Sequence, residues 1–89
     1  MKYTVLWSHR AEEDLATLWV HAEERSSIAE AANEIDQRLH NNAPDEGESR
    51  SPGVRILLVP PLGVTFTVSA EDQLVRIVHV WQFKNRRES

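Results

Sequence analysis

Two arginines stand inside apolar runs in the second half of this 89-residue chain. Arg55 lies in the run 54–59 and Arg76 lies in the run 74–83. A guanidinium group can form two parallel hydrogen bonds with a carboxylate or a phosphate. The two arginines are therefore the first candidates for binding a partner or for stabilising negative charge.

Two histidine–carboxylate pairs have the four-residue spacing that places both side chains on one face of a helix. They are His9 with Glu13 and Asp36 with His40. Each pair could supply two metal ligands, but the sequence places no third ligand, and the same spacing is common on solvated helices. We therefore expect no metal and no cofactor. His79 is predicted as a core or rim histidine on the helix-facing side of its strand, without a catalytic role.

The elements that must position these side chains are marked by β-branched and aromatic runs that turn residues interrupt. The runs predict one strand over 2–7 and three further strands within 54–83, with short connections at 60–63 and 70–73. Connections this short join antiparallel neighbours. The segment 54–83 is therefore predicted to be an antiparallel meander.

Two amphipathic helices are predicted between the first strand and the meander. Ser8 is the expected N-cap of the first helix, and Ser27 with Glu30 has the pattern of a capping box for the second. The polar segment 44–53 is predicted to be a mobile loop. The expected fold class is α+β: a two-layer sandwich in the order β-α-α-β-β-β, with a helical hairpin packed on one face of an antiparallel sheet.

Alternation along the strands divides the meander into two faces. The helix-facing set is predicted to be Val54, Ile56, Leu58, Val64, Phe66, Val68, Val75, Ile77, Trp81 and Phe83. The open set is predicted to be Arg55, Leu57, Thr65, Thr67, Arg76, Val78, Val80 and Gln82. Guanidinium and hydroxyl groups among exposed aliphatics are typical of a contact surface, so we expect the open set to bind a partner. Trp81, near the end of its strand, is expected to stack on the same partner.

Charge is distributed unevenly along the chain. Residues 1–49 hold 11 acidic and 4 basic side chains, whereas residues 50–89 hold 3 acidic and 6 basic ones. The net charge of −4 disfavours nucleic-acid binding by bulk electrostatics but allows a local basic face. The chain has no cysteine and no apolar run that could cross a bilayer, so a cytoplasmic protein is expected. We predict one domain over 1–83 and a flexible basic tail over 84–89, in which Lys84, Arg86 and Arg87 contact a partner.

The segment Ser8-His9-Arg10-Ala11-Glu12-Glu13-Asp14-Leu15 resembles the S-x-x-A-x-x-D-L start of the first helix in the RelE/ParE superfamily of type II toxin-antitoxin toxins. The proline-bearing loop after the second helix and the segment Gly53-Val54-Arg55-Ile56-Leu57-Leu58 are also similar to that superfamily. The resemblance covers roughly residues 3–83. It implies a helical hairpin on an antiparallel sheet, the first strand beside the last, and a cognate antitoxin as partner.

Within this superfamily, RelE-like members are ribosome-dependent mRNA endonucleases, and ParE-like members inhibit DNA gyrase without the nuclease residues. The RelE-like site uses basic side chains on the second and third strands of the chain, and an arginine and a tyrosine near its end. Arg55 alone matches that site, because Gly63 and Val64 stand where an arginine is expected and Tyr3 is at the wrong end of the chain. The resemblance therefore implies a ParE-like toxin of the plasmid-stabilisation type that acts by protein binding. A RelE-like ribonuclease using Arg55, Arg76 and the tail, or a non-toxic homodimeric interaction module, is the alternative.

Overall fold

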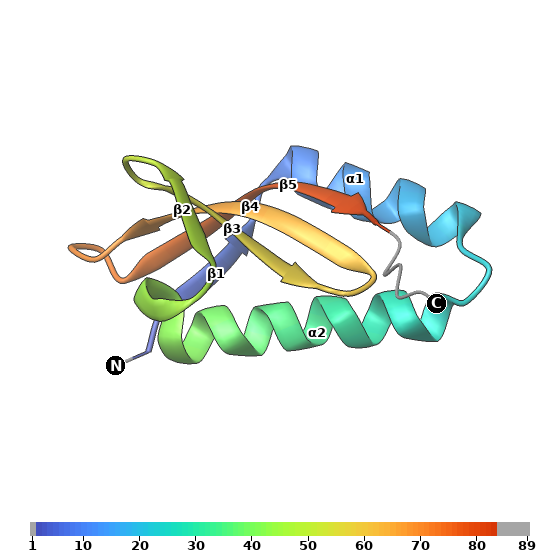
Figure 1. Ribbon diagram of the computed structural model, residues 1–89, viewed down its shortest axis with the longest axis horizontal. Helices are drawn as coiled ribbons and strands as arrows, with labels where there is room; N and C mark the ends of the chain where they lie inside the picture. The colour runs from blue at the N-terminus through green and yellow to red at the C-terminus, as the bar shows by residue number, and fades with distance from the viewer. Residues whose placement is uncertain (1, 84–89) are drawn as a thin grey trace.

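The computed structural model describes residues 2–83, which form a twisted five-stranded sheet with two helices packed against it (Figure 1). The strands are β1 (Thr4–Trp7), β2 (Glu48–Ser51), β3 (Val54–Val59), β4 (Leu62–Ser69) and β5 (Leu74–Gln82). The helices are α1 (His9–His21), α2 (Arg25–Asn42) and the short 3-10 helix η1 (Ala43–Asp45). The predicted α+β fold with two helices on one sheet is confirmed.

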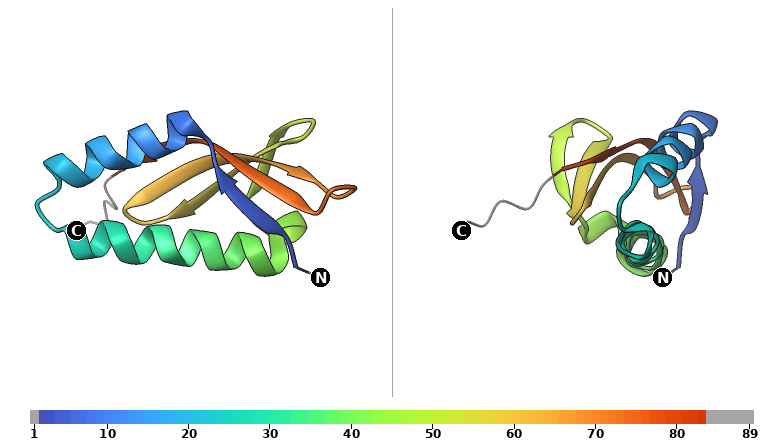
Figure 2. Two further views of the ribbon diagram at one scale, coloured as in Figure 1. Left: turned by 180° about the vertical axis from the view of Figure 1, so that it is seen from behind. Right: turned by 90° about the vertical axis from the view of Figure 1, so that its right-hand side faces the viewer.

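The strand order across the sheet is β1-β5-β4-β3-β2. β3, β4 and β5 form the predicted antiparallel meander, and β1 lies beside β5 as the resemblance implied. β1 runs parallel to β5, with Thr4 opposite Leu74, so the sheet is mixed and not purely antiparallel. Seen along α2, β1 and β2 lie at opposite sides of the sheet (Figure 2).

The expectation that residues 44–53 form a loop is wrong, because this segment contains most of η1 and all of β2. β2 pairs antiparallel with β3, and all four of its residues are exposed. A strand that is exposed on both faces lacks the apolar alternation by which strands are recognised in sequence. Its charged residues, Glu48 and Arg50, also disfavour pairing of this edge with another chain.

Helix α1 begins where the sequence predicts it. The hydroxyl of Ser8 accepts a hydrogen bond from the backbone N–H of Ala11 at 3.0 Å, which satisfies one of the free donors of the first turn. Ala11 is fully buried, and its small side chain lets the helix approach the sheet closely.

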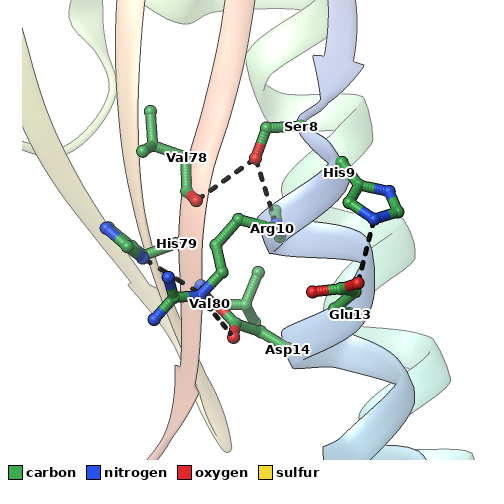
Figure 3. A network of polar contacts seen from close by, with 9 residues as sticks. Ser8, His9, Arg10, Glu13, Asp14, Val78, His79 and Val80 are labelled. Atoms are coloured by element: carbon green, nitrogen blue, oxygen red, sulfur yellow. Dashed lines mark hydrogen bonds and ion pairs between the residues drawn. The ribbon is translucent and has the colours of Figure 1, made fainter.

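Ser8, the N-cap of α1, and Asp14 within α1 bond to the edge of β5 beyond the end of β1 (Figure 3). The backbone N–H of Ser8 donates to the carbonyl of Ile77 at 2.9 Å, and the hydroxyl of Ser8 donates to the carbonyl of Val78 at 3.2 Å. Two turns further along α1, the carboxylate of Asp14 accepts from the N–H of Val80 at 3.2 Å. The Ser, Ala and Asp of the S-x-x-A-x-x-D-L segment therefore have structural roles: they fix α1 against β5.

Helix α2 begins at Arg25, before the predicted N-cap, and the Ser27–Glu30 capping box is not formed. The hydroxyl of Ser27 donates instead to Glu24 Oε1 at 2.9 Å. Arg25 Nε donates to the carbonyl of Trp19 at 2.9 Å, and its guanidinium lies over the indole, 5.8 Å from the ring centre. The same carbonyl also accepts from the backbone N–H of Ala22 at 3.3 Å, so the arginine adds a second donor at the end of α1 and stabilises the tight turn between the helices.

The hydrophobic core lies between the helices and one side of the sheet, which we call the covered face. Helical spacing predicts an apolar stripe on α2 of Ile28, Ala31, Ala32, Ile35 and Leu39, and all of these are buried except Ala32, which is partly buried. The buried residues of β3, β4 and β5 include Leu57, Val59, Leu62, Val64, Phe66, Val75, Ile77 and Val80. Phe66 is the largest side chain among the fully buried residues, and burying one such side chain stabilises the fold by about 1.5–3 kcal/mol.

The predicted orientation of β3 is wrong. Leu57 is only 5% exposed whereas Leu58 is 52% exposed, so the odd-numbered residues of β3 face the helices. The register agrees, because Leu57 is opposite the buried Val64 and Arg55 is opposite the buried Phe66. Five of the six residues of β3 are apolar, so alternation leaves the orientation of the strand undetermined, and its one charged residue, Arg55, faces the covered side and not solvent.

A β-bulge at Val78 reverses the predicted orientation of the second half of β5. Val78 lies between the residues that pair with Phe66 and Thr65, and has no partner of its own on β4. Beyond it, Val80 is buried on the covered face and Trp81 lies on the other face, the opposite of the prediction. One inserted residue moves every later side chain to the other face, and the apolar pattern of β5 does not reveal the insertion.

Candidate partner-binding face

The opposite side of the meander, which we call the uncovered face, is not covered by any helix or strand within residues 2–83. Directly opposite residues of neighbouring strands share a face, so the register defines its members. They form the rows Ser69–Leu74, Val54–Thr67–Arg76, Ile56–Thr65–His79 and Leu58–Gly63–Trp81.

One end of the uncovered face is apolar and is built around Trp81. The indole of Trp81 lies over Gly63, because a Cβ atom added to this glycine would be 2.6 Å from Cε2 of the ring. Any larger residue at position 63 would displace the indole. Leu58, in the same row, is 52% exposed. A partly buried indole beside an exposed leucine offers an apolar anchor of the kind found in the centres of interfaces.

The other end of the uncovered face carries Arg76. This exposed arginine lies between Thr67 of β4 and Leu6 of β1, and Leu6 is itself 44% exposed. A guanidinium group among aliphatic and hydroxyl side chains can bind a partner's carboxylate with two hydrogen bonds.

His79 lies in the middle row, beside Thr65, because the bulge at Val78 turns it to this face. Its predicted place on the helix-facing side is therefore wrong. The Nδ1 atom of His79 is 3.9 Å from Asp14 Oδ2, which is too far for a hydrogen bond, and its side chain is about half exposed (Figure 3). His79 thus lies at the surface, near the carboxylate that holds Val80.

Arg55 does not belong to the uncovered face, so its predicted position is wrong. It lies opposite Phe66 on the covered side, and its guanidinium donates to the carbonyls of Glu46 at 2.7 Å and Gly47 at 2.9 Å. Gly47 has a φ of 75°, and a Cβ atom there would be 2.5 Å from the carbonyl oxygen of Ile56. The chain can pass this close to β3 only with glycine, and Arg55 fastens it there.

The other predicted contact residues are distributed as follows. Those that lie on the uncovered face are Thr65, Thr67, Arg76 and Trp81. Those that are buried under the helices, against the prediction, are Leu57 and Val80. Gln82 is opposite Leu62 on the covered side, and Val78 is the bulge residue. Lys84, Arg86 and Arg87 lie outside the described residues.

Sequence reasoning misses Val54, Ile56, Leu58, Gly63 and His79 as members of the uncovered face. One signal for this part of the face is present in the sequence. Gly63 interrupts a run of β-branched and apolar residues, and a glycine inside a strand often marks the close approach of another group. That group is Trp81, which the prediction placed on the opposite face.

Of the two histidine–carboxylate pairs, only His9 and Glu13 contact each other in the described part of the chain, whereas Asp36 and His40 contact Trp7 and the carbonyl of Tyr3. His9 Nε2 is 2.9 Å from Glu13 Oε2 on the exposed surface of α1 (Figure 3), and Asp36 accepts a hydrogen bond from the indole N–H of Trp7 at 3.3 Å. No three His, Cys, Asp or Glu side chains in the described part of the chain could hold a metal ion together. Over the same residues, no helix is both long enough and apolar enough to span a membrane.

No family model and no curated protein matches this sequence. Solved structures do match. A chain of the RelBE2 toxin-antitoxin complex from Mycobacterium tuberculosis has a TM-score of 0.76 at 19% identity, over 92% of each chain. A chain of the chromosomal ParDE system from P. aeruginosa has a TM-score of 0.70 at 20% identity, over 93% of this chain and 98% of that one.

A free-state mutant of the E. coli toxin RelE has a TM-score of 0.72 at 14% identity, over 92% of this chain and 84% of that one. The RelE and ParE structures therefore match about equally well, and the likeness does not separate the two types of toxin. At these identities the matches establish the fold. The chain has the fold of the RelE/ParE superfamily of toxin-antitoxin toxins.

Proposed function

We propose that this chain is the toxin of a type II toxin-antitoxin module, that it is ParE-like and binds a gyrase-type protein target, and that a cognate antitoxin neutralises it. Similar chains come from the RelBE2 and ParDE systems, which supports an antitoxin as the partner. The choice of a ParE-like mode of action depends on the chemistry of the uncovered face.

The position of cationic side chains on that face favours binding over cleavage. Cleaving RNA at a ribose 2′-hydroxyl requires groups that take up a proton, stabilise charge on the phosphate and protonate the leaving oxygen. In the described residues, β3 and β4 present aliphatic and hydroxyl side chains on the uncovered face and no cationic one. Arg55, the residue on β3 that matches a RelE-like site, is held by backbone carbonyls on the other side.

The uncovered face suits a short segment of an antitoxin. Apolar side chains of that segment would pack on Trp81 and Leu58, and a carboxylate would bind Arg76 at the opposite end. A helix laid in a groove and an added strand are both established ways of binding such a segment. The apolar row would supply most of the affinity, because buried aromatic anchors dominate interface energetics.

Expression in bacteria tests the toxin assignment. We expect growth to stop when this chain is expressed alone, and to continue when the reading frame beside its gene is expressed with it. The control is an Ile35→Asp variant, which puts a charge into the core and should prevent folding. Loss of growth arrest in this variant would show that arrest requires the folded chain. Harmless expression of the folded wild-type protein at high level would contradict the proposal, and a gyrase supercoiling assay tests the target.

A RelE-like ribonuclease is the second candidate, and one observation favours it. The bulge at Val78 brings Arg76 and His79 to the same face, so a cation for phosphate and a group for proton transfer lie on one strand. Incubation with translating ribosomes separates the candidates. Codon-positioned cleavage that is lost in Arg76→Leu and His79→Phe would establish the nuclease, and an absence of cleavage by the wild type would eliminate it.

A non-toxic interaction module that forms homodimers is the third candidate. It would leave growth unaffected and would elute as a dimer in a solution size measurement, whereas a toxin would arrest growth whatever its oligomeric state.

A further inference from the structure

A cleft of about 600 Å³ opens where the α1–α2 turn and the β3–β4 turn meet the end of β5. Its walls come from the α1–α2 turn with Glu23 and Glu24, from Ser27 in the first turn of α2, from the Pro60–Pro61 turn between β3 and β4, and from Gln82 at the end of β5. The α1–α2 turn, the β3–β4 turn and the end of β5 all lie toward the right of the view in Figure 1.

The cleft is acidic on one side and apolar on the other. Glu23 and Glu24 are exposed, and no lysine or arginine is among the described residues that line the cleft. Ser27 donates to Glu24 Oε1 at 2.9 Å, which holds this carboxylate at the wall. The two prolines supply an apolar wall opposite. Such a site fits an extended basic segment, whose cationic groups pair with carboxylates while its aliphatic stems cover apolar surface.

The chain itself supplies a segment of this kind at the edge of the cleft. Gln82 lines the cleft, and the N–H of Phe83 donates to the carbonyl of Pro61 at 2.9 Å. The next six residues are Lys84-Asn85-Arg86-Arg87-Glu88-Ser89, with three cationic side chains and one acidic one. Six residues reach roughly 20 Å when extended, so the segment can span the cleft from its starting point.

We propose that residues 84–89 dock in this cleft, with Arg86 and Arg87 paired to Glu23 and Glu24. A short covalent tether keeps the basic side chains at an effective concentration in the millimolar range, so weak individual ion pairs suffice to populate the docked state. A partner that uses the same basic residues must then compete with the two glutamates. The proposal concerns the isolated chain and holds whether or not the chain is a toxin.

A nitroxide at the end of the chain tests the docking. The sequence has no cysteine, so Ser89→Cys provides a single labelling site in the full chain. We expect the strongest paramagnetic broadening of backbone amides at Glu23, Glu24 and Ser27. We expect most of this broadening to be lost in about 1 M salt, where the Debye length is about 3 Å.

Charge reversal supplies the control. Glu23→Lys with Glu24→Lys should abolish the broadening, and adding Arg86→Glu with Arg87→Glu should restore it. Glu12→Lys with Glu13→Lys makes the same charge change at the other end of α1 and should leave the broadening intact. Unchanged amide positions in the core would show that each variant is folded. Broadening that avoids the cleft, that survives reversal of the two glutamates, or that arises between labelled and unlabelled copies would overturn the proposal.

Discussion

Each face of the β3-β4-β5 meander carries one arginine, and the two arginines have different surroundings. Arg55, on the covered face, donates to two backbone carbonyls and holds the segment after α2 against the sheet. Arg76, on the uncovered face, is exposed between a threonine and a leucine. The comparison shows that a charged residue inside an apolar strand does not by itself mark the side of a sheet that is left uncovered. It predicts that substitutions on the covered face affect stability and those on the uncovered face affect binding.

The largest difference between the faces is expected from two substitutions in β4. Phe66→Ala removes the largest fully buried side chain and should lower the free energy of unfolding by about 3–5 kcal/mol. Thr65→Ala, one residue away on the uncovered face, should change it by less than about 1 kcal/mol. Urea denaturation followed by circular dichroism measures both. Equal losses of unfolding free energy in the two variants would contradict the assignment of Phe66 to a buried face and Thr65 to an uncovered one.

The two arginines provide the next test. Arg55→Leu removes two hydrogen bonds from a charged donor and leaves two carbonyls without that donor, so it should lower the free energy of unfolding by about 1.5–3 kcal/mol. Arg76→Leu should stay within about 0.5 kcal/mol of the wild type. The same denaturation experiment compares them, and a larger loss for Arg76→Leu would reverse our assignment of roles.

A smaller effect is expected at the contact between α1 and β5. Asp14→Ala leaves the N–H of Val80 without its carboxylate acceptor and should cost about 1–2 kcal/mol, since water can partly replace the acceptor at a strand edge. Glu13→Ala is the matched control, because Glu13 pairs only with the exposed His9 in the described contacts, and it should cost less than about 0.5 kcal/mol. Hydrogen exchange of the Val80 amide should be faster in the first variant alone.

The smallest effect on stability, with a clear local signature, is expected at Gly63. An added methyl group in Gly63→Ala would collide with the indole of Trp81, so the ring must move off the strand. We expect a loss of about 1 kcal/mol and a large shift of the Trp81 indole resonance. Unchanged indole shifts would mean that Trp81 is not packed on this glycine.

Much of the fold is predictable from local chemistry. Ser8 forms the expected cap, the apolar stripe of α2 is buried as its spacing indicates, and the short connections enforce an antiparallel meander. β2 was not predictable by alternation, because a fully exposed strand has no apolar face.

The composition of the uncovered face was harder to predict, for two physical reasons. β3 is apolar on both sides, so Arg55 alone decided its predicted orientation, and the hydrogen bonds that draw this arginine to the covered side come from a segment whose path the sequence did not reveal. In β5, a single unpaired residue, Val78, turned Trp81 outward. Correcting the two orientations removes Arg55 and Gln82 from the uncovered face and places Leu58 and Trp81 on it.

The most direct test of the uncovered face is a map of backbone amide shifts in the isotope-labelled chain as the product of the neighbouring reading frame is added. We expect the largest changes at Ile56, Leu58, Thr65, Arg76 and Trp81, and a much weaker complex with the Trp81→Ala variant. Shifts confined to the outer surfaces of α1 and α2, with unchanged affinity for Trp81→Ala, would contradict the assignment of this face to partner binding.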